Sequence, residues 1–293
     1  MKNFTRDGLV FDVRDSAETG GDGPRGTAVL LHGFPQDSSA WAAVTPGLVD
    51  AGLRVLAPDL RGYSPGARPS ETSAYRLEVL AGDVLALMDA AGVDQAHIVG
   101  HDWGGALAWE VAIRHPERVS HLTVLSTPHP AAMTWAMSHT TQALKSWYMT
   151  AVQIPVLPER MMAAMVRRRG LGRLGLPPEQ EASYRSRLVT EEGWRGGLAW
   201  YRAQWLRPLS GSISADGPVT VPTTYLWGAK DAFLGREAAE RTGQYVEAPY
   251  RFVTVDGGHW LPEKCAPQVV EAVVAGVEAS ASDSSGGDTP SAD

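Results

Sequence analysis

The chain has 293 residues, 44% of them apolar and 20% charged, which is typical of a folded globular protein with room for one large domain and an insertion. Its formal net charge of −7, to which Asp283, Asp288 and Asp293 contribute, argues against nucleic acid and anionic membrane as partners. One cysteine, Cys265, excludes an internal disulfide, and we find neither a secretory signal nor a membrane-spanning apolar run, so we expect a cytoplasmic protein.

Short apolar runs alternate with amphipathic stretches from residue 25 onward. Continuously apolar centres predict strands buried on both faces at 25–33, 53–62, 95–102, 119–127, 220–228 and 250–258. Helical spacing predicts helices at about 38–51, 74–91, 104–115 and 266–278. This alternation predicts an α/β fold in which helices cover both faces of a mostly parallel sheet.

Residues 129–217 interrupt the alternation. They hold half of the ten tryptophans and no convincing strand, so we expect a helical insertion at the carboxyl edge of the sheet, where such sheets bind ligands. The core then comes in two parts, 1–128 and 218–279. The small polar residues of 280–293 predict a disordered tail.

The sequence Gly100-His101-Asp102-Trp103-Gly104 lies between a predicted strand and a predicted helix. This spacing is that of a nucleophile elbow, a tight turn that lifts its central side chain above the sheet edge. A carboxylate is ionised at neutral pH and needs no base to attack a saturated carbon that carries a leaving oxygen or halide. Asp102 is therefore the candidate nucleophile, and the alternative is that it caps the helix.

An ester formed on Asp102 has to be cleaved by activated water. His259, in a Gly-Gly turn after a late strand, is the candidate base, and Asp231, after the preceding strand, is its candidate partner, with Asp256 as a rival. The backbone N–H groups of Phe34 and Trp103 are candidates for holding the negative oxygen that forms during this step.

At these residues the chain resembles the epoxide hydrolase branch of the α/β-hydrolase superfamily. The resemblance covers about residues 1–279, through HGFP (32–35), GHDWGG (100–105), the Asp231 loop and GGHW (257–260). It implies a core sheet of eight strands with an inserted helical cap. It also implies hydrolysis of an epoxide to a vicinal diol through an Asp102 ester, without cofactor or metal. The partners are then a small epoxide, apolar in view of the aromatic insertion, and water, while the oligomeric state stays open.

The same family has two cap tyrosines that protonate the epoxide oxygen. Tyr148 and Tyr201 stand in similar sequence contexts, and a phenol is a suitable proton donor to an alkoxide. The alternative is that both rings only pack within the cap. We expect the substrate to be lined by Phe34, Trp103, Trp147 and Trp260.

Two other functions stay open. A haloalkane dehalogenase would use the same aspartate, with the Trp103 indole binding halide and a second donor supplied by Trp135 or Trp147, because the side chain of Phe34 has none. A non-catalytic ligand-binding protein on the same scaffold is the alternative of another class.

One further motif has a simpler explanation. GLGRLG (170–175) fits a dinucleotide-binding pattern but follows an arginine-rich helical stretch instead of a strand, so we interpret it as a loop. The arginines of this region predict a solvated face, and Met161, Met162 and Met165 the apolar side of its helix.

Overall fold

A sheet of eight strands forms the centre of the computed structural model, which describes residues 1–19, 25–172, 176, 178–205 and 217–285. The order in the sheet is β1-β2-β4-β3-β5-β6-β7-β8. β1 and β2 pair antiparallel with each other, as do β2 and β4, and every other neighbouring pair is parallel. The strands are β1 (Asn3–Arg6), β2 (Leu9–Asp15), β3 (Thr27–Leu31), β4 (Arg54–Pro58), β5 (Ala96–His101), β6 (Val119–Leu125), β7 (Thr223–Gly228) and β8 (Tyr250–Val255).

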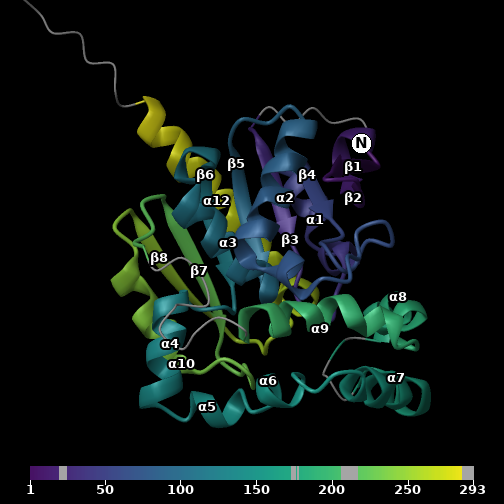
Figure 1. Cartoon of the computed structure of the whole chain (residues 1–293). Helices are drawn as coiled ribbons and strands as arrows, with labels where there is room; N and C mark the ends of the chain where they lie inside the picture. The colour runs from purple at the N-terminus through teal and green to yellow at the C-terminus, as the bar shows by residue number, and fades with distance from the viewer. Residues whose placement is uncertain (20–24, 173–175, 177, 206–216, 286–293) are drawn as a thin grey trace, which may run out of the picture.

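Helices cover both faces of this sheet, which confirms the predicted α/β fold. α2 (Leu77–Ala90) and α3 (Trp103–Arg114) pack on one face, and α1 (Thr45–Asp50) and α12 (Ala266–Ser285) on the other (Figure 1). Every residue of β5 and β7 is buried, because side chains on both sides of a central strand meet a helical layer.

Two predicted helices begin later than expected. The helix expected at 38–51 is a short 3-10 turn (Ser38–Trp41) followed by α1, because Pro46 lacks an N–H and is tolerated only in the first turn of a helix. The helix expected at 74–91 is likewise a 3-10 turn (Thr72–Tyr75) and then α2, separated by the extended backbone of Arg76.

Both ends of the chain differ from the sequence interpretation. The sequence analysis assigned no strand before residue 25, yet β1 and β2 form a hairpin whose turn, Asp7-Gly8, has positive φ at both residues. At the other end α12 continues to Ser285, so the tail expected from residue 280 begins as helix, and residues 286–293 lie outside the described part of the chain.

The described residues between β6 and β7 contain helices and no strand, as expected for 129–217, although 206–216 lie outside the described part. Figure 1 shows these helices gathered at one end of the sheet, with α9 nearest to the core. We call residues 129–217 the insertion. Its helices are α4 (Pro130–His139), α5 (Gln142–Lys145), α6 (Tyr148–Ala151), α7 (Leu157–Arg169), α8 (Pro178–Leu188) and α9 (Glu192–Trp205). α10 (Arg236–Arg241) and α11 (Leu261–Lys264) belong to the core.

Two glycines allow α9 to lie directly on the core. A Cβ on Gly196 would lie 2.1 Å from the carbonyl oxygen of Gly62, and one on Gly197 would lie 2.7 Å from the ring of Phe34. The Trp200 indole of the same helix donates to the Arg61 carbonyl at 2.9 Å. The close approach therefore fixes α9, and the side chains it carries, against the loops after β3 and β4.

This contact predicts that Gly196→Ala destabilises the protein. The added methyl group would meet backbone, which cannot rotate away, so we expect a loss of about 1–3 kcal/mol in the free energy of unfolding. Thermal and urea unfolding measure it. The control is Gly172→Ala, whose methyl would meet only the Glu181 carboxylate at 3.8 Å. Equal stability of the two variants would contradict the close contact.

Candidate active site

The turn between β5 and α3 places Asp102 in a strained backbone conformation, with φ 53° and ψ −120°. Residues other than glycine rarely adopt a backbone conformation with positive φ, and this conformation costs on the order of 1–3 kcal/mol. The turn is tight because its neighbours are glycines. A Cβ on Gly104 would lie 2.1 Å from the Leu31 carbonyl oxygen, and one on Gly100 would lie 2.3 Å from the Gly104 carbonyl oxygen. The elbow expected from the sequence is therefore present.

The carboxylate of Asp102 faces two other loops. Its Oδ1 accepts a hydrogen bond from the Phe34 backbone N–H at 2.7 Å, and its Oδ2 lies 3.4 Å from His259 Nε2. Gly33 permits this approach, since a Cβ there would lie 2.4 Å from the Asp102 Cβ. Asp102 occupies the N-cap position of α3, but its side chain accepts no capping hydrogen bond, so the capping alternative is wrong.

His259 and Asp231 form a buried pair behind this carboxylate. His259 Nδ1 lies 2.8 Å from Asp231 Oδ2, while Asp231 Oδ1 accepts hydrogen bonds from the backbone N–H groups of Phe233 and Leu234 at 2.8 and 3.0 Å. The rival acid, Asp256, is 83% exposed and pairs with Lys230 at 2.6 Å. The structure thus brings Asp231, and not Asp256, to the imidazole.

The three charged groups shift one another's pKa. Burial is the largest effect on His259 and lowers its pKa, but the charge of Asp231 and hydrogen bonds to Asp231 and Asp102 outweigh it and raise the pKa to about 10. Burial likewise raises the pKa of both carboxyls, and the imidazole outweighs it, so both lie below their ordinary values. At neutral pH the resting site therefore holds two carboxylates and one imidazolium.

Two tyrosines from the insertion lie over this group. Tyr201 on α9 packs its ring 4.8 Å from the Trp103 ring and 5.3 Å from that of Phe34, and its ring centroid is 6.1 Å from that of Tyr148. Tyr148 also contacts the ring of Phe233. Burial, followed by nearby charge that includes Asp102, raises the pKa of both phenols, so both hydroxyls carry a proton at neutral pH.

The structure brings three of the four expected lining residues together. Phe34 and Trp103 surround Tyr201, and the Trp260 ring lies 5.2 Å from that of His259. Trp147, the fourth expected lining residue, lies outside this group, and 69% of its surface is exposed. It precedes Tyr148, and successive side chains on a helix diverge by about 100°, so a tyrosine that faces inward leaves its neighbour outside.

A buried network missed by the sequence analysis connects the loops of the site. The amide oxygen of Gln36 accepts from the Gly33 N–H at 3.0 Å and lies 2.9 Å from His101 Nδ1, while its amide nitrogen donates to Glu263 at 2.6 Å. His101 Nε2 lies 2.8 Å from the His259 carbonyl oxygen.

His101 and Gln36 lie inside or beside the quoted motifs, so their positions were visible in the sequence. Glu263 gave no such signal, because carboxylates usually lie at the surface. Burial and the charge of His259 hold the pKa of His101 at about 4, so this imidazole is neutral and serves to position the loops.

The structure describes residues 170–172, the first half of the GLGRLG motif, and they agree with its interpretation as a loop. Gly170 ends α7, so the motif follows a helix, while 173–175, Arg173 included, lie outside the described residues. Within the described part of the chain, no cluster of histidine, cysteine, aspartate and glutamate is arranged to hold a metal ion, and no helix is long and apolar enough to span a membrane.

Comparisons with known proteins agree with this geometry. Residues 28–264 match the family model described as alpha/beta hydrolase fold. The chain is 35% identical to AB hydrolase superfamily protein YfhM of Bacillus subtilis, over 82% of this chain and 85% of the relative. It is 30% identical to Epoxide hydrolase A of Mycobacterium tuberculosis, over 91% and 94%.

Solved structures show the same likeness. Epoxide Hydrolase A from Mycobacterium thermoresistibile superposes with a TM-score of 0.73 at 27% identity, covering 94% of this chain and 97% of that chain. The structure of one of the novel epoxide hydrolases found in metagenomes from hot environments superposes with a TM-score of 0.75 at 28% identity, covering 94% of this chain and 97% of that chain. The fold, the elbow and these relatives together show that the chain belongs to the epoxide hydrolase branch of the α/β-hydrolase superfamily.

Proposed function

We propose that this protein hydrolyses an apolar epoxide to a vicinal diol through a covalent ester on Asp102. The observation that carries the proposal is the placing of an ionised, strained aspartate between two neutral tyrosines and a buried His259–Asp231 pair. A carboxylate suits attack on a saturated carbon, and the phenols suit protonation of the oxygen that leaves it. The aromatic surroundings favour an apolar substrate.

In the first half-reaction an oxygen of Asp102 attacks one epoxide carbon. A carbon–oxygen bond forms to the carboxylate while the bond to the epoxide oxygen breaks, and its electron pair stays on that oxygen. Tyr148 or Tyr201 donates a proton to the new alkoxide and becomes a phenolate. Because the phenols are buried near negative charge, this phenolate is unfavourable and recovers a proton from the His259 imidazolium.

The ester changes the chemistry of His259. Alkylation removes the negative charge of Asp102, which is one of the groups that raise the pKa of the imidazole. The neutral imidazole left by the first half-reaction can then take a proton from water, and the hydroxide adds to the ester carbonyl carbon of Asp102. We expect the backbone N–H groups of Phe34, which donates to Asp102 Oδ1 in the resting site, and of Trp103 to stabilise the negative oxygen. The tetrahedral intermediate then collapses and expels the alkoxide of the diol, which takes the proton of the added hydroxide, so that the diol leaves, Asp102 is again a carboxylate and His259 is again an imidazolium.

The two alternatives find less support. The second halide donor would have to be Trp135, whose ring stacks on His139 with centroids 5.1 Å apart, or Trp147, which is largely exposed. A ligand-binding protein does not need the His259–Asp231 pair held at 2.8 Å. We therefore favour the epoxide reaction.

Replacing the base predicts a trapped intermediate. His259→Gln should form the ester but hydrolyse it about 10²–10⁴-fold more slowly, because general base catalysis is lost. Intact-protein mass spectrometry should show one epoxide mass added, and peptide mapping should place it on Asp102. His139→Gln, at an exposed site, is the control and should show no adduct. No adduct across a broad epoxide panel would count against the mechanism, and halide release with an inactive epoxide panel would favour the dehalogenase.

Removing the phenol protons predicts slower ring opening. Tyr148→Phe and Tyr201→Phe should each lower the rate of the single-turnover burst, and the double variant should lower it by about 10²–10⁴-fold. Rapid-quench detection of the ester measures this step. Tyr250→Phe is the control, because this tyrosine lies on the edge strand β8 and its buried hydroxyl has no hydrogen-bond partner among the described residues. A double variant with the wild-type burst rate would rule out the acid role.

The charge coupling predicts the direction of a pKa change. Asp102→Asn removes a carboxylate that favours the imidazolium, so the pKa of His259 should fall from about 10. Titration of ¹⁵N-labelled histidine by NMR measures it, and His115→Gln, remote from the site, controls for signal assignment. An unchanged pKa would show that the Asp102 charge does not set the protonation of the base.

A further inference from the structure

Exposed apolar side chains concentrate in one part of the insertion, residues 142–169, which we call the outer edge. Six of the seven large apolar side chains that are exposed in the described part of the chain lie there: Leu144 (74%), Trp147 (69%), Ile154 (51%), Val156 (50%), Leu157 (49%) and Met161 (63%). The sequence analysis placed Met161, Met162 and Met165 together on the apolar side of their helix, but only Met162 and Met165 pack against the core, and Met161 is exposed. A concentration of exposed apolar side chains on a monomeric protein usually marks an interaction site.

The exposed charges of the outer edge are all positive. Its cations are Lys145, Arg160, Arg167, Arg168 and Arg169, each with an exposed side chain. Its one acidic residue, Glu159, is 6% exposed and pairs with Arg202 of α9 at 2.6 Å. Glu191, which directly precedes α9, lies 3.5 Å from Arg160. On a chain of net charge −7 this edge is a local cationic surface.

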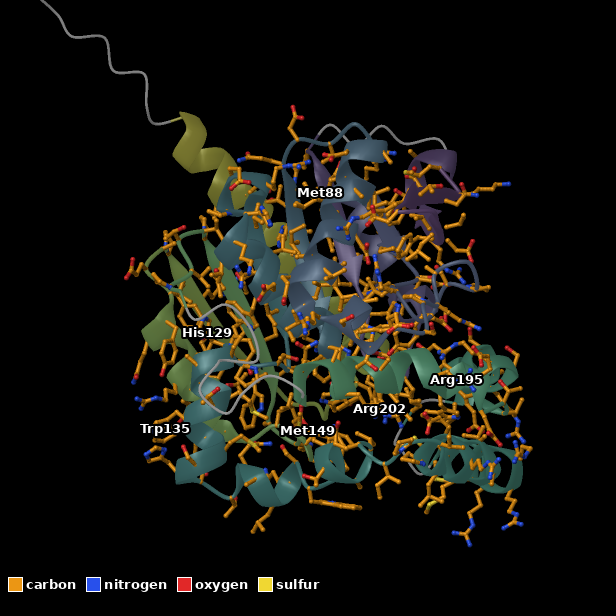
Figure 2. All side chains as sticks on the ribbon, viewed as in Figure 1. Met88, His129, Trp135, Met149, Arg195 and Arg202 are labelled. Carbon is orange, nitrogen blue, oxygen red and sulfur yellow. The ribbon has the colours of Figure 1, made fainter. Side chains whose placement is uncertain are left out.

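The outer edge is also the part of the insertion that faces away from the sheet. Figure 1 shows α5, α6 and α7 along the side of the molecule opposite to the core, with α9 between α7 and the core. Arg202 points from α9 toward this edge and donates to the carbonyls of Val152 and Ile154, which fixes the segment before α7 (Figure 2). Val156 has φ 68°, unusual for a β-branched residue, and the strain is not offset by burying its side chain.

The charge pattern distinguishes between possible occupants. A symmetric contact with a second copy would bring like charges together, because the edge offers no exposed acid of its own. A nucleic acid would leave the apolar side chains unused. An anionic lipid surface satisfies both features, since tryptophan and aliphatic side chains enter the headgroup boundary while lysine and arginine contact the headgroups.

We propose that the outer edge docks on the surface of an anionic membrane. The negative net charge expected to prevent this contact is spread over the rest of the molecule, and charges more than about 10 Å from a surface are screened at physiological salt. The cations of the edge act at close range, each contributing about fivefold to the partition coefficient when it lies near the surface. Arg160 contributes less because it also pairs with Glu191. The proposal does not depend on the proposed reaction.

Cosedimentation of the full-length protein with vesicles tests it. The probes are vesicles of phosphatidylcholine alone and of phosphatidylcholine mixed with phosphatidylglycerol, at low and high salt. We expect binding to the mixed vesicles, weaker binding to phosphatidylcholine, and loss at high salt. The triple variant Arg167→Glu, Arg168→Glu, Arg169→Glu should lose at least tenfold in binding to the mixed vesicles. The triple variant Leu144→Ser, Ile154→Ser, Met161→Ser should lose it as well.

A matched control separates local from overall charge. Arg25→Glu, Arg236→Glu, Arg251→Glu changes the net charge equally at exposed sites outside the insertion and should keep wild-type binding. Thermal unfolding checks that all variants are folded. The proposal is overturned if the wild type binds neither vesicle, or if the control loses binding as much as the edge variants do. It is also overturned if ultracentrifugation shows a dimer that the serine variant dissociates while vesicle binding is absent.

Discussion

The left-handed backbone of Asp102 is the constraint around which the rest of the site is built. A residue with a side chain at φ 53° persists only if its surroundings hold it, and here they do so by close contact. At Gly33, Gly100 and Gly104 a side chain would collide with the atoms of the turn or of the neighbouring β3 loop, so glycine at these positions makes the turn possible. The carboxylate is thereby presented to the Phe34 N–H and to His259, at the carboxyl end of the central strands, instead of capping its own helix.

Once the carboxylate is in place, charge determines how the site works. One imidazole between two carboxylates is held as a cation, which favours ionised Asp102, the proposed nucleophile, but disfavours His259 as a base. The proposed ester resolves this conflict because it removes one of the two negative charges before a base is needed. Gln36 and His101 hold the loops that carry these groups, and the neutral state of His101 keeps a second positive charge away from His259.

The insertion has two unlike faces. Its inner helix, α9, approaches the core through Gly196 and Gly197 and carries Tyr201 to the ring of Trp103. Its outer helices carry the exposed apolar and cationic side chains that we assign to a lipid surface. Arg202 joins the two layers by its ion pair with Glu159, so the side chains on both faces belong to one packed unit.

The sequence by itself determined the alternating α/β fold, the elbow at Asp102 and the chain order of the candidate nucleophile, acid and base, because buried strands and tight glycine turns leave local patterns. It also held signals that were not used, such as Asp7-Gly8 for the first hairpin and Pro46 for the start of α1. Only the tertiary structure decided between Asp231 and Asp256, turned Trp147 outward, and buried Glu263 beneath the site. Those outcomes depend on which distant segments pack together, and the exposure of a side chain is set by that packing and not by its neighbours in the chain.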